Sequence, residues 1–119
     1  MYSVKVEMNF SAAHNLRGYR GKCEALHGHN WKVEACLRGK ALDKCGMLAD
    51  FSGIKRQLAA VLDELDHRYL NGSAYFKKVN PTSENIAKYI FARLKPRLKG
   101  LCCVTVWESE NSAATYYGK

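Results

Sequence analysis

The first stretch of the chain alternates apolar and polar residues one by one. A period of two is typical of an antiparallel strand with one face buried and the other in solvent. The same parity places Ala12 and His14 on the apolar face, so we expect His14 to look inward at the end of this strand. The strand is predicted over residues 2–10 from its apolar positions, Tyr2, Val4, Val6, Met8 and Phe10.

A second alternating stretch follows after a long loop. The loop, residues 15–26, contains Gly18 and Gly21, and loops of this length are often functional. If the second strand begins near His27, then His27 and His29 share the parity of its apolar residues and lie beside a buried surface. Those apolar residues are Trp31, Val33, Ala35 and Leu37.

The middle of the chain changes to a helical period. Ser52 can cap a first helix with apolar positions Ile54, Leu58, Val61, Leu62, Leu65 and Tyr69. A second helix begins near Asn80–Glu84, where a hydroxyl cap and an acidic first turn occur, and Pro96 should end or kink it. Its buried stripe consists of Ile86, Ala87, Ile90, Phe91 and Leu94.

Two more strands, over residues 101–108 and 113–117, complete the order ββααββ. We therefore predict an α+β fold in which one four-stranded antiparallel sheet carries both helices on one face. Residues 1–119 are expected to form a single domain, and the two open sheet edges could be closed by neighbouring subunits.

Cysteine usage and hydropathy indicate a compartment. No apolar run resembles a signal peptide or reaches the length of a membrane span, and five cysteines without a C-x-x-C pair favour reduced thiols, so a cytoplasmic protein without a membrane partner is expected. Cys102 and Cys103 are adjacent in a predicted strand. We expect their side chains to point to opposite faces and to serve packing.

The formal net charge of +8 favours an anionic partner. The basic residues are scattered along the chain, and none belongs to a nucleic-acid-binding motif. We expect no nucleic-acid partner, and the charge instead suits a phosphorylated small molecule or a solvated surface.

Three of the four histidines fall at a metal-binding spacing, His14 and then His27-x-His29. Three neutral imidazoles suit a zinc ion that keeps one position open for water or substrate. Cys23 leaves two alternatives. As a fourth ligand it would close the site, whereas as a free thiol beside the cation it would favour the reactive thiolate. A chain that binds no metal is the remaining alternative.

Several further motifs follow one another along the chain. They are Phe10-Ser11-Ala12-Ala13-His14, Cys23-x-x-x-His27-Gly28-His29, Asp50-Phe51, Leu65-Asp66-His67-x-x-Leu70-Asn71, Pro81-Thr82-Ser83-Glu84-Asn85 and Glu108. In this order they resemble the 6-pyruvoyl-tetrahydropterin synthase and 6-carboxytetrahydropterin synthase family. The similarity runs from Phe10 to Gly118, almost the whole chain.

The resemblance implies a tunnelling fold, in which three subunits join their sheets into a barrel and two trimers form a homohexamer. It implies zinc as cofactor and the following site residues: His14, His27 and His29 as ligands, Cys23 as catalytic thiol, Asp66 and His67 as a catalytic pair from a neighbouring subunit, and Glu108 as the pterin anchor.

Some of these residues have simpler interpretations. His67 could be a solvent-exposed histidine at a helix end. Glu108 shares the parity of Val104 and Val106, and a buried carboxylate needs a partner, which a pterin would supply. Weaker substrate-binding candidates are Thr82, Ser83 and Glu84, which can equally cap the helix.

The family substrate is 7,8-dihydroneopterin triphosphate. The implied reaction yields 6-carboxy-5,6,7,8-tetrahydropterin, a queuosine and 7-deazapurine precursor, with loss of triphosphate and acetaldehyde. In the pyruvoyl branch the side chain is kept. Glu24, directly after Cys23, resembles relatives that release 6-hydroxymethyl-7,8-dihydropterin for folate synthesis, although it could also be an ordinary loop carboxylate.

A protein that binds zinc and pterin without turnover is an alternative of a different class, and an acidic-ligand or RNA-binding module is a more distant one. Cys23, Asp66 and His67 favour an enzyme, because a binding protein would have no use for the thiol.

Overall fold

One long hairpin forms the centre of the sheet. The computed structural model describes residues 1–18 and 25–118. Strands β1 (Tyr2–His14) and β2 (His27–Gly39) pair without interruption from Tyr2 opposite Gly39 to His14 opposite His27. The predicted alternation is confirmed from Val4 to His14 on β1, and the pairing brings His14 and His27 side by side.

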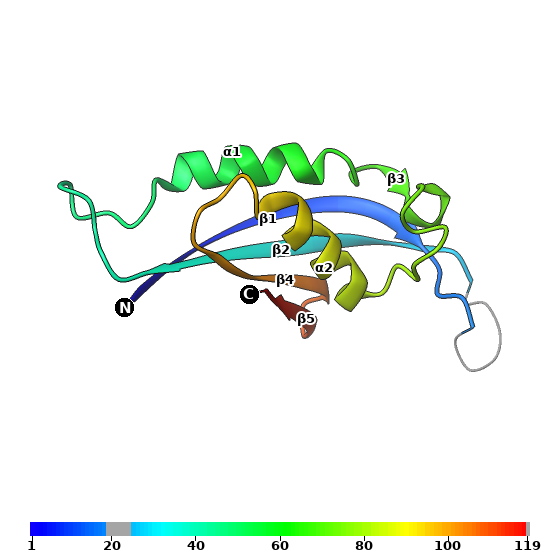
Figure 1. Ribbon diagram of the computed structural model, residues 1–119. Helices are drawn as coiled ribbons and strands as arrows, with labels where there is room; N and C mark the ends of the chain where they lie inside the picture. Colours follow the sequence, from blue (N-terminus) through cyan, green and yellow to red (C-terminus); the bar gives the residue numbers. More distant parts are fainter. Residues whose placement is uncertain (19–24, 119) are drawn as a thin grey trace.

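Two further strands extend the sheet beyond β2. Strand β4 (Leu101–Ser109) pairs with β2, and β5 (Ser112–Tyr117) pairs with β4, both antiparallel. The order in the sheet is β3-β1-β2-β4-β5, and the helices lie over one side of it (Figure 1). The predicted α+β architecture is therefore confirmed, with five strands in the sheet rather than four.

The additional strand, β3 (Arg68–Tyr69), has no signal in the sequence pattern. It runs parallel to the end of β1, with Ala12 opposite Arg68 and Ala13 opposite Tyr69. The pattern assigned Tyr69 to the first helix, but α1 (Phe51–Leu62) ends earlier, and Tyr69 is half exposed. The chain turns away at His67, whose φ of 57° lies outside the helical region.

Helix α1 has a different cap from the predicted one. Its cap is Asp50, whose carboxylate accepts a hydrogen bond from the Ser52 backbone N–H at 3.0 Å, and not Ser52 itself. Helix α2 (Ser83–Leu94) ends just before Pro96, as expected, and a short 3₁₀ turn, η1 (Leu70–Gly72), follows β3. The apolar stripes of both helices pack on the inner face of the sheet, with Trp31, Leu58, Ile90 and Val104 fully buried.

A β-bulge interrupts the pairing of β2 with β4. Cys36 lies opposite Cys103 and Leu37 lies opposite Leu101, so Cys102 is one extra residue in β4. The prediction that Cys102 and Cys103 point to opposite faces is wrong, since their sulfur atoms lie 3.9 Å apart. A bulge inserts a residue and thereby breaks the strict alternation on which that prediction relied.

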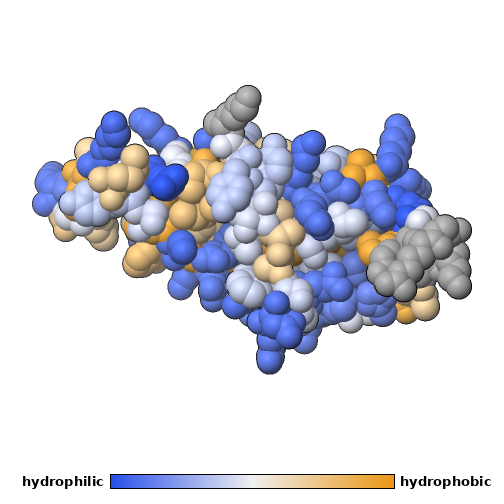
Figure 2. All heavy atoms as spheres, turned by 90° about the horizontal axis from the view of Figure 1, so that it is seen from below, coloured by the Kyte–Doolittle hydropathy of each residue, from blue (hydrophilic) through white to orange (hydrophobic). Residues whose placement is uncertain are grey.

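The face viewed in Figure 2, from below the sheet as drawn in Figure 1, is mostly hydrophilic, with apolar side chains scattered between polar ones. Among the described residues, no helix combines the length and the apolar character that a membrane span requires.

Candidate active site

Three histidine rings converge where β1 and β2 meet the loop. His14 and His27 are direct cross-strand partners, and His29 follows on the same face. The ring centroids lie 4.7 Å (His14 to His27), 5.2 Å (His14 to His29) and 4.6 Å (His27 to His29) apart. We call the three rings the histidine cluster; each ring and the Glu108 carboxylate offer a ligand atom, all within 4.8 Å of one another.

Backbone carbonyls orient two of the rings. Nδ1 of His14 lies 2.8 Å from the carbonyl oxygen of Pro81, and Nδ1 of His27 lies 2.9 Å from that of Ala25. A carbonyl oxygen can only accept, so in the neutral imidazole Nδ1 carries the proton and Nε2 presents its lone pair. The two Nε2 atoms lie 3.1 Å apart. Two lone pairs at this distance suit a cation that both can bind, and outer hydrogen bonds of this kind are typical of metal-binding histidines.

Trp31 supports the cluster from the core side. Its ring meets those of His14 and His29 edge-on, with centroids 4.8 and 5.1 Å away, and its indole N–H donates to the Ala12 carbonyl at 3.3 Å. His14 is only 1% exposed. A rigid, buried wall therefore limits how far these imidazoles can turn.

Glu108 connects the histidine cluster to the start of α2. One carboxylate oxygen lies 3.4 Å from Nε2 of His29, and the other accepts from the Ser83 hydroxyl at 3.4 Å. The Thr82 hydroxyl accepts from the backbone N–H of Asn85 at 3.1 Å, so Thr82 caps the helix. The three predicted positions Thr82, Ser83 and Glu84 line one hollow of about 400 Å³ together with Glu108.

Asp66 and His67 form a second group. The Asp66 carboxylate accepts from the Ser11 backbone N–H at 2.9 Å and lies 3.0 Å from Nδ1 of His67. The Ser11 N–H, followed by the His67 ring, holds the pKa of Asp66 below its usual range. The His67 side chain is 82% exposed. In the described part of the chain, these two residues do not join the histidine cluster.

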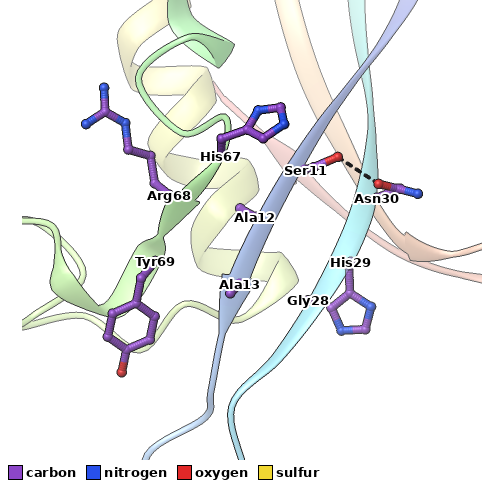
Figure 3. Close-up of a pocket in the computed structure, with 9 residues that line it drawn as sticks. All are labelled: Ser11, Ala12, Ala13, Gly28, His29, Asn30, His67, Arg68 and Tyr69. Atoms are coloured by element: carbon purple, nitrogen blue, oxygen red, sulfur yellow. Dashed lines mark hydrogen bonds between the residues drawn. The ribbon is translucent and has the colours of Figure 1, made fainter.

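An open groove links the two groups along the strands. It has a volume of about 570 Å³, and both His29 and His67 line it. Figure 3 shows His67 pointing toward β1 near Ser11, whose hydroxyl is hydrogen-bonded to Asn30, while His29 extends from β2. The groove leaves room for a ligand or for a second copy of the chain beside the exposed His67 ring. The predicted residues Cys23 and Glu24 lie outside the described residues.

A search against protein families matches residues 3–119 to the model described as 6-pyruvoyl tetrahydropterin synthase. The chain belongs to this family. Among curated relatives, a 6-carboxy-5,6,7,8-tetrahydropterin synthase of Synechocystis is 40% identical, with 98% of this chain and 94% of that protein covered. One of Haemophilus influenzae with the same name is 31% identical, with 98% and 99% covered.

The solved structure of Caenorhabditis elegans 6-pyruvoyl tetrahydropterin synthase superposes with a TM-score of 0.87 at 31% identity, covering 99% of this chain and 96% of that one. The tunnelling fold and the assignment as a tetrahydropterin synthase therefore follow from the comparisons.

The candidate site also contains residues that sequence reasoning missed. Arg17 and Asn80 line the hollow beside Glu108. The Arg17 backbone N–H donates to the Asn80 side chain at 2.9 Å, and its guanidinium donates to the Phe76 carbonyl at 2.7 Å. In the sequence, Arg17 is one of several scattered basic residues. The pattern of residues could not show contacts between segments so far apart in the chain.

Proposed function

We propose that this chain is a zinc-dependent 6-carboxy-5,6,7,8-tetrahydropterin synthase. It would convert 7,8-dihydroneopterin triphosphate with loss of triphosphate and acetaldehyde, as one synthase domain over residues 1–119. The observation that carries the proposal is the pair of Nε2 atoms of His14 and His27, which lie 3.1 Å apart, while each Nδ1 is hydrogen-bonded to a backbone carbonyl. The choice among pterin products is supported by the names of the Synechocystis and Haemophilus relatives.

The donor set fits zinc. His14, His27 and His29 would hold the ion, and three imidazoles leave a position for water or substrate. When bound, zinc supplies a Lewis acid for the side-chain hydroxyls of the substrate. Glu108, which is within reach of the cluster, is in our proposal the anchor of the pterin ring. Its two oxygens suit the amino and ring N–H donors of a pterin, which the charge would strengthen.

The proton transfers would fall to two groups of the chain. Cys23 as thiolate would take a proton from the substrate side chain and return it. The Asp66 carboxylate would orient His67 through Nδ1, which leaves Nε2 of that ring to exchange a proton with the substrate. Arg17, beside Glu108, is a cation suited to the triphosphate.

A homohexamer built from two trimers is part of this proposal. The sheet ends on both sides in short strands, β3 with two residues and β5 with six, which leaves backbone groups available for pairing with another chain. The 82% exposure of His67 supports a role for the Asp66–His67 pair in the site of a neighbouring copy.

A second product is worth testing because Glu24 follows Cys23 directly. A second base at this place could remove a proton from a different hydroxyl and direct carbon-carbon cleavage to 6-hydroxymethyl-7,8-dihydropterin. The substrate is the same for both products, so only the products distinguish the two functions.

The experiment is mass spectrometry of pterins formed from dihydroneopterin triphosphate by zinc-loaded wild type, Cys23→Ala and Glu24→Ala. We expect 6-carboxytetrahydropterin from the wild type and a large loss of turnover in Cys23→Ala. Equal consumption by wild type and Cys23→Ala would contradict the role of the thiol. A hydroxymethyl product that disappears in Glu24→Ala would establish the second function. A 6-pyruvoyl product in place of the 6-carboxy product would show that the chain is a 6-pyruvoyl-tetrahydropterin synthase.

A further inference from the structure

Three cysteine thiols gather on the sheet, away from the histidine cluster. Cys36 on β2 and Cys102 and Cys103 on β4 have sulfur atoms that all lie within 4.8 Å of one another, and we call this group the thiol cluster. All three are free cysteines. Cys36 is 7% exposed, and the other two are half-buried. The neighbours of Cys36 along β2, Ala35 and Leu37, belong to the core, so Cys36 lies on the opposite face of the strand.

The bulge in β4 creates this arrangement. Cys103 lies directly opposite Cys36, and the extra residue Cys102 is accommodated between Leu101 and Cys103. The Cys102 thiol donates to the Cys36 carbonyl at 3.2 Å and lies 3.9 Å from the Cys103 sulfur. A regular strand would place one of the two adjacent thiols on the core face.

The spacing of the sulfur atoms fits a single bound ion. Three sulfurs at a metal–thiolate distance of about 2.3 Å in one plane lie about 4 Å from each other. Within residues 1–18 and 25–118, no fourth histidine, cysteine or carboxylate joins the group. A set of three thiolates favours a soft ion with low coordination number, whereas structural zinc prefers four ligands.

We propose that Cys36, Cys102 and Cys103 form a binding site for one Cu(I) ion. Binding forms three Cu–S bonds and releases three thiol protons, and no electron is transferred. The charge of the bound group is then the sum of one positive and three negative charges, which leaves two negative charges to be compensated.

Basic residues next to the thiol cluster supply part of this compensation. Lys5 is the cross-strand partner of Cys36, and Arg38 follows two residues later on β2. Both attract the thiolate form electrostatically, Lys5 at Cys36 and Arg38 at Cys102. The negative charge of Glu34 disfavours the thiolate at Cys103. The Lys5 ammonium lies 3.8 Å from the Glu34 carboxylate.

Burial raises the pKa of all three thiols above the ordinary value. Near neutral pH they are therefore protonated, and an ion must displace protons in order to bind. This property distinguishes the cluster from a catalytic cysteine, which functions as a thiolate.

The test is an anaerobic titration of the zinc-loaded full chain with Cu(I) in competition with a Cu(I)-specific chelator. X-ray absorption at the copper edge then counts sulfur and nitrogen neighbours. We expect one Cu(I) per chain with three sulfur neighbours and no imidazole, and a rise in Tm, because the ion binds only the folded sheet. Cys103→Ser and Cys102→Ser should each weaken binding by at least about tenfold.

Matched variants separate this site from the other thiols. Cys45→Ser removes an exposed cysteine, and Cys23→Ser removes the thiol proposed for the active site, and both should retain the Cu(I). Circular dichroism of each variant without copper shows whether it is folded. The proposal is overturned if folded Cys103→Ser and Cys102→Ser bind Cu(I) as the wild type does, if only Cys23→Ser loses it, or if copper is bound through nitrogen. If the thiol cluster binds zinc in preference to Cu(I), the choice of ion is overturned.

Discussion

The histidine cluster and the thiol cluster each combine residues of β2 with residues of a neighbouring strand, but they differ in how they are built. The histidine cluster uses the regular alternation of β1 and β2, and two of its rings are held through Nδ1 by backbone carbonyls. The thiol cluster depends on an irregularity, the extra residue in β4, and its Cys102 thiol donates to the Cys36 carbonyl.

The difference shows where the fold prepares a site for chemistry. The histidine cluster lies beside the hollow at the start of α2 and the groove that His67 lines, so an ion there can meet a ligand of substantial size. The thiol cluster adjoins neither that hollow nor that groove. An ion at the thiols would stabilise the pairing of β2 with β4 and would have no substrate to act on.

The largest effect is expected when one cluster is removed and the other is retained. His29→Ala deletes a ligand and should lower zinc affinity and turnover by more than about 100-fold, since even outer-shell changes reach that range. Cys103→Ser should change zinc affinity and turnover by no more than about twofold relative to the wild type. Metal content per chain by mass spectrometry and pterin turnover by chromatography check the comparison. Full zinc and turnover in His29→Ala would show that the ion is held elsewhere.

An intermediate effect should separate capping from ligand binding at the start of α2. Thr82→Ala removes the cap and should lower the free energy of unfolding by about 1 kcal/mol. Ser83→Ala leaves that cap in place but removes the hydroxyl beside Glu108, so it should mainly raise KM. Urea unfolding and initial rates measure the two. A Ser83→Ala variant with unchanged KM and reduced stability would reverse the assignment.

The smallest effect concerns Asp66. Its pKa is lowered in the folded state, so its stabilising contribution is present above the ordinary aspartate pKa, about 4, and is lost as the pH falls through the lowered value. The Asp66→Asn variant carries an amide that does not titrate in this range. The Tm difference between wild type and Asp66→Asn should therefore be largest near neutral pH and disappear in acid.

Thermal melts across this pH range measure the difference, with Glu110→Gln, in the exposed turn before β5, as the control variant. A constant Tm difference between wild type and Asp66→Asn at all pH values would assign the effect to packing.

Regular periodicity explains what could be predicted from the sequence. Parity placed His14, His27 and His29 on the apolar faces of two strands, and the pairing of His14 with His27 in the structure brings these faces together. The start of α2 was recognisable from its hydroxyl cap and acidic first turn. Parity also placed Glu108 on the inner face, and the structure brings it within 3.4 Å of His29, although its side chain is 38% exposed rather than buried.

The features that were missed depend on tertiary contacts or on a single inserted residue. Strand β3 has only two residues and exists because it pairs with the end of β1. The bulge at Cys102 has no compositional signal, because adjacent cysteines are equally compatible with a regular strand. The position of Arg17 depends on the Phe76 carbonyl and on Asn80, which are far away in sequence.

The backbone conformation of His67 affects which substitutions a screen for heat resistance would select. It holds a left-handed backbone conformation, φ 57°, which costs an ordinary L-residue about 1 kcal/mol and glycine almost nothing. A screen for heat resistance alone would therefore favour glycine at this position. Such a variant would lose the imidazole that we place in proton transfer, so its gain in robustness would come at the expense of turnover.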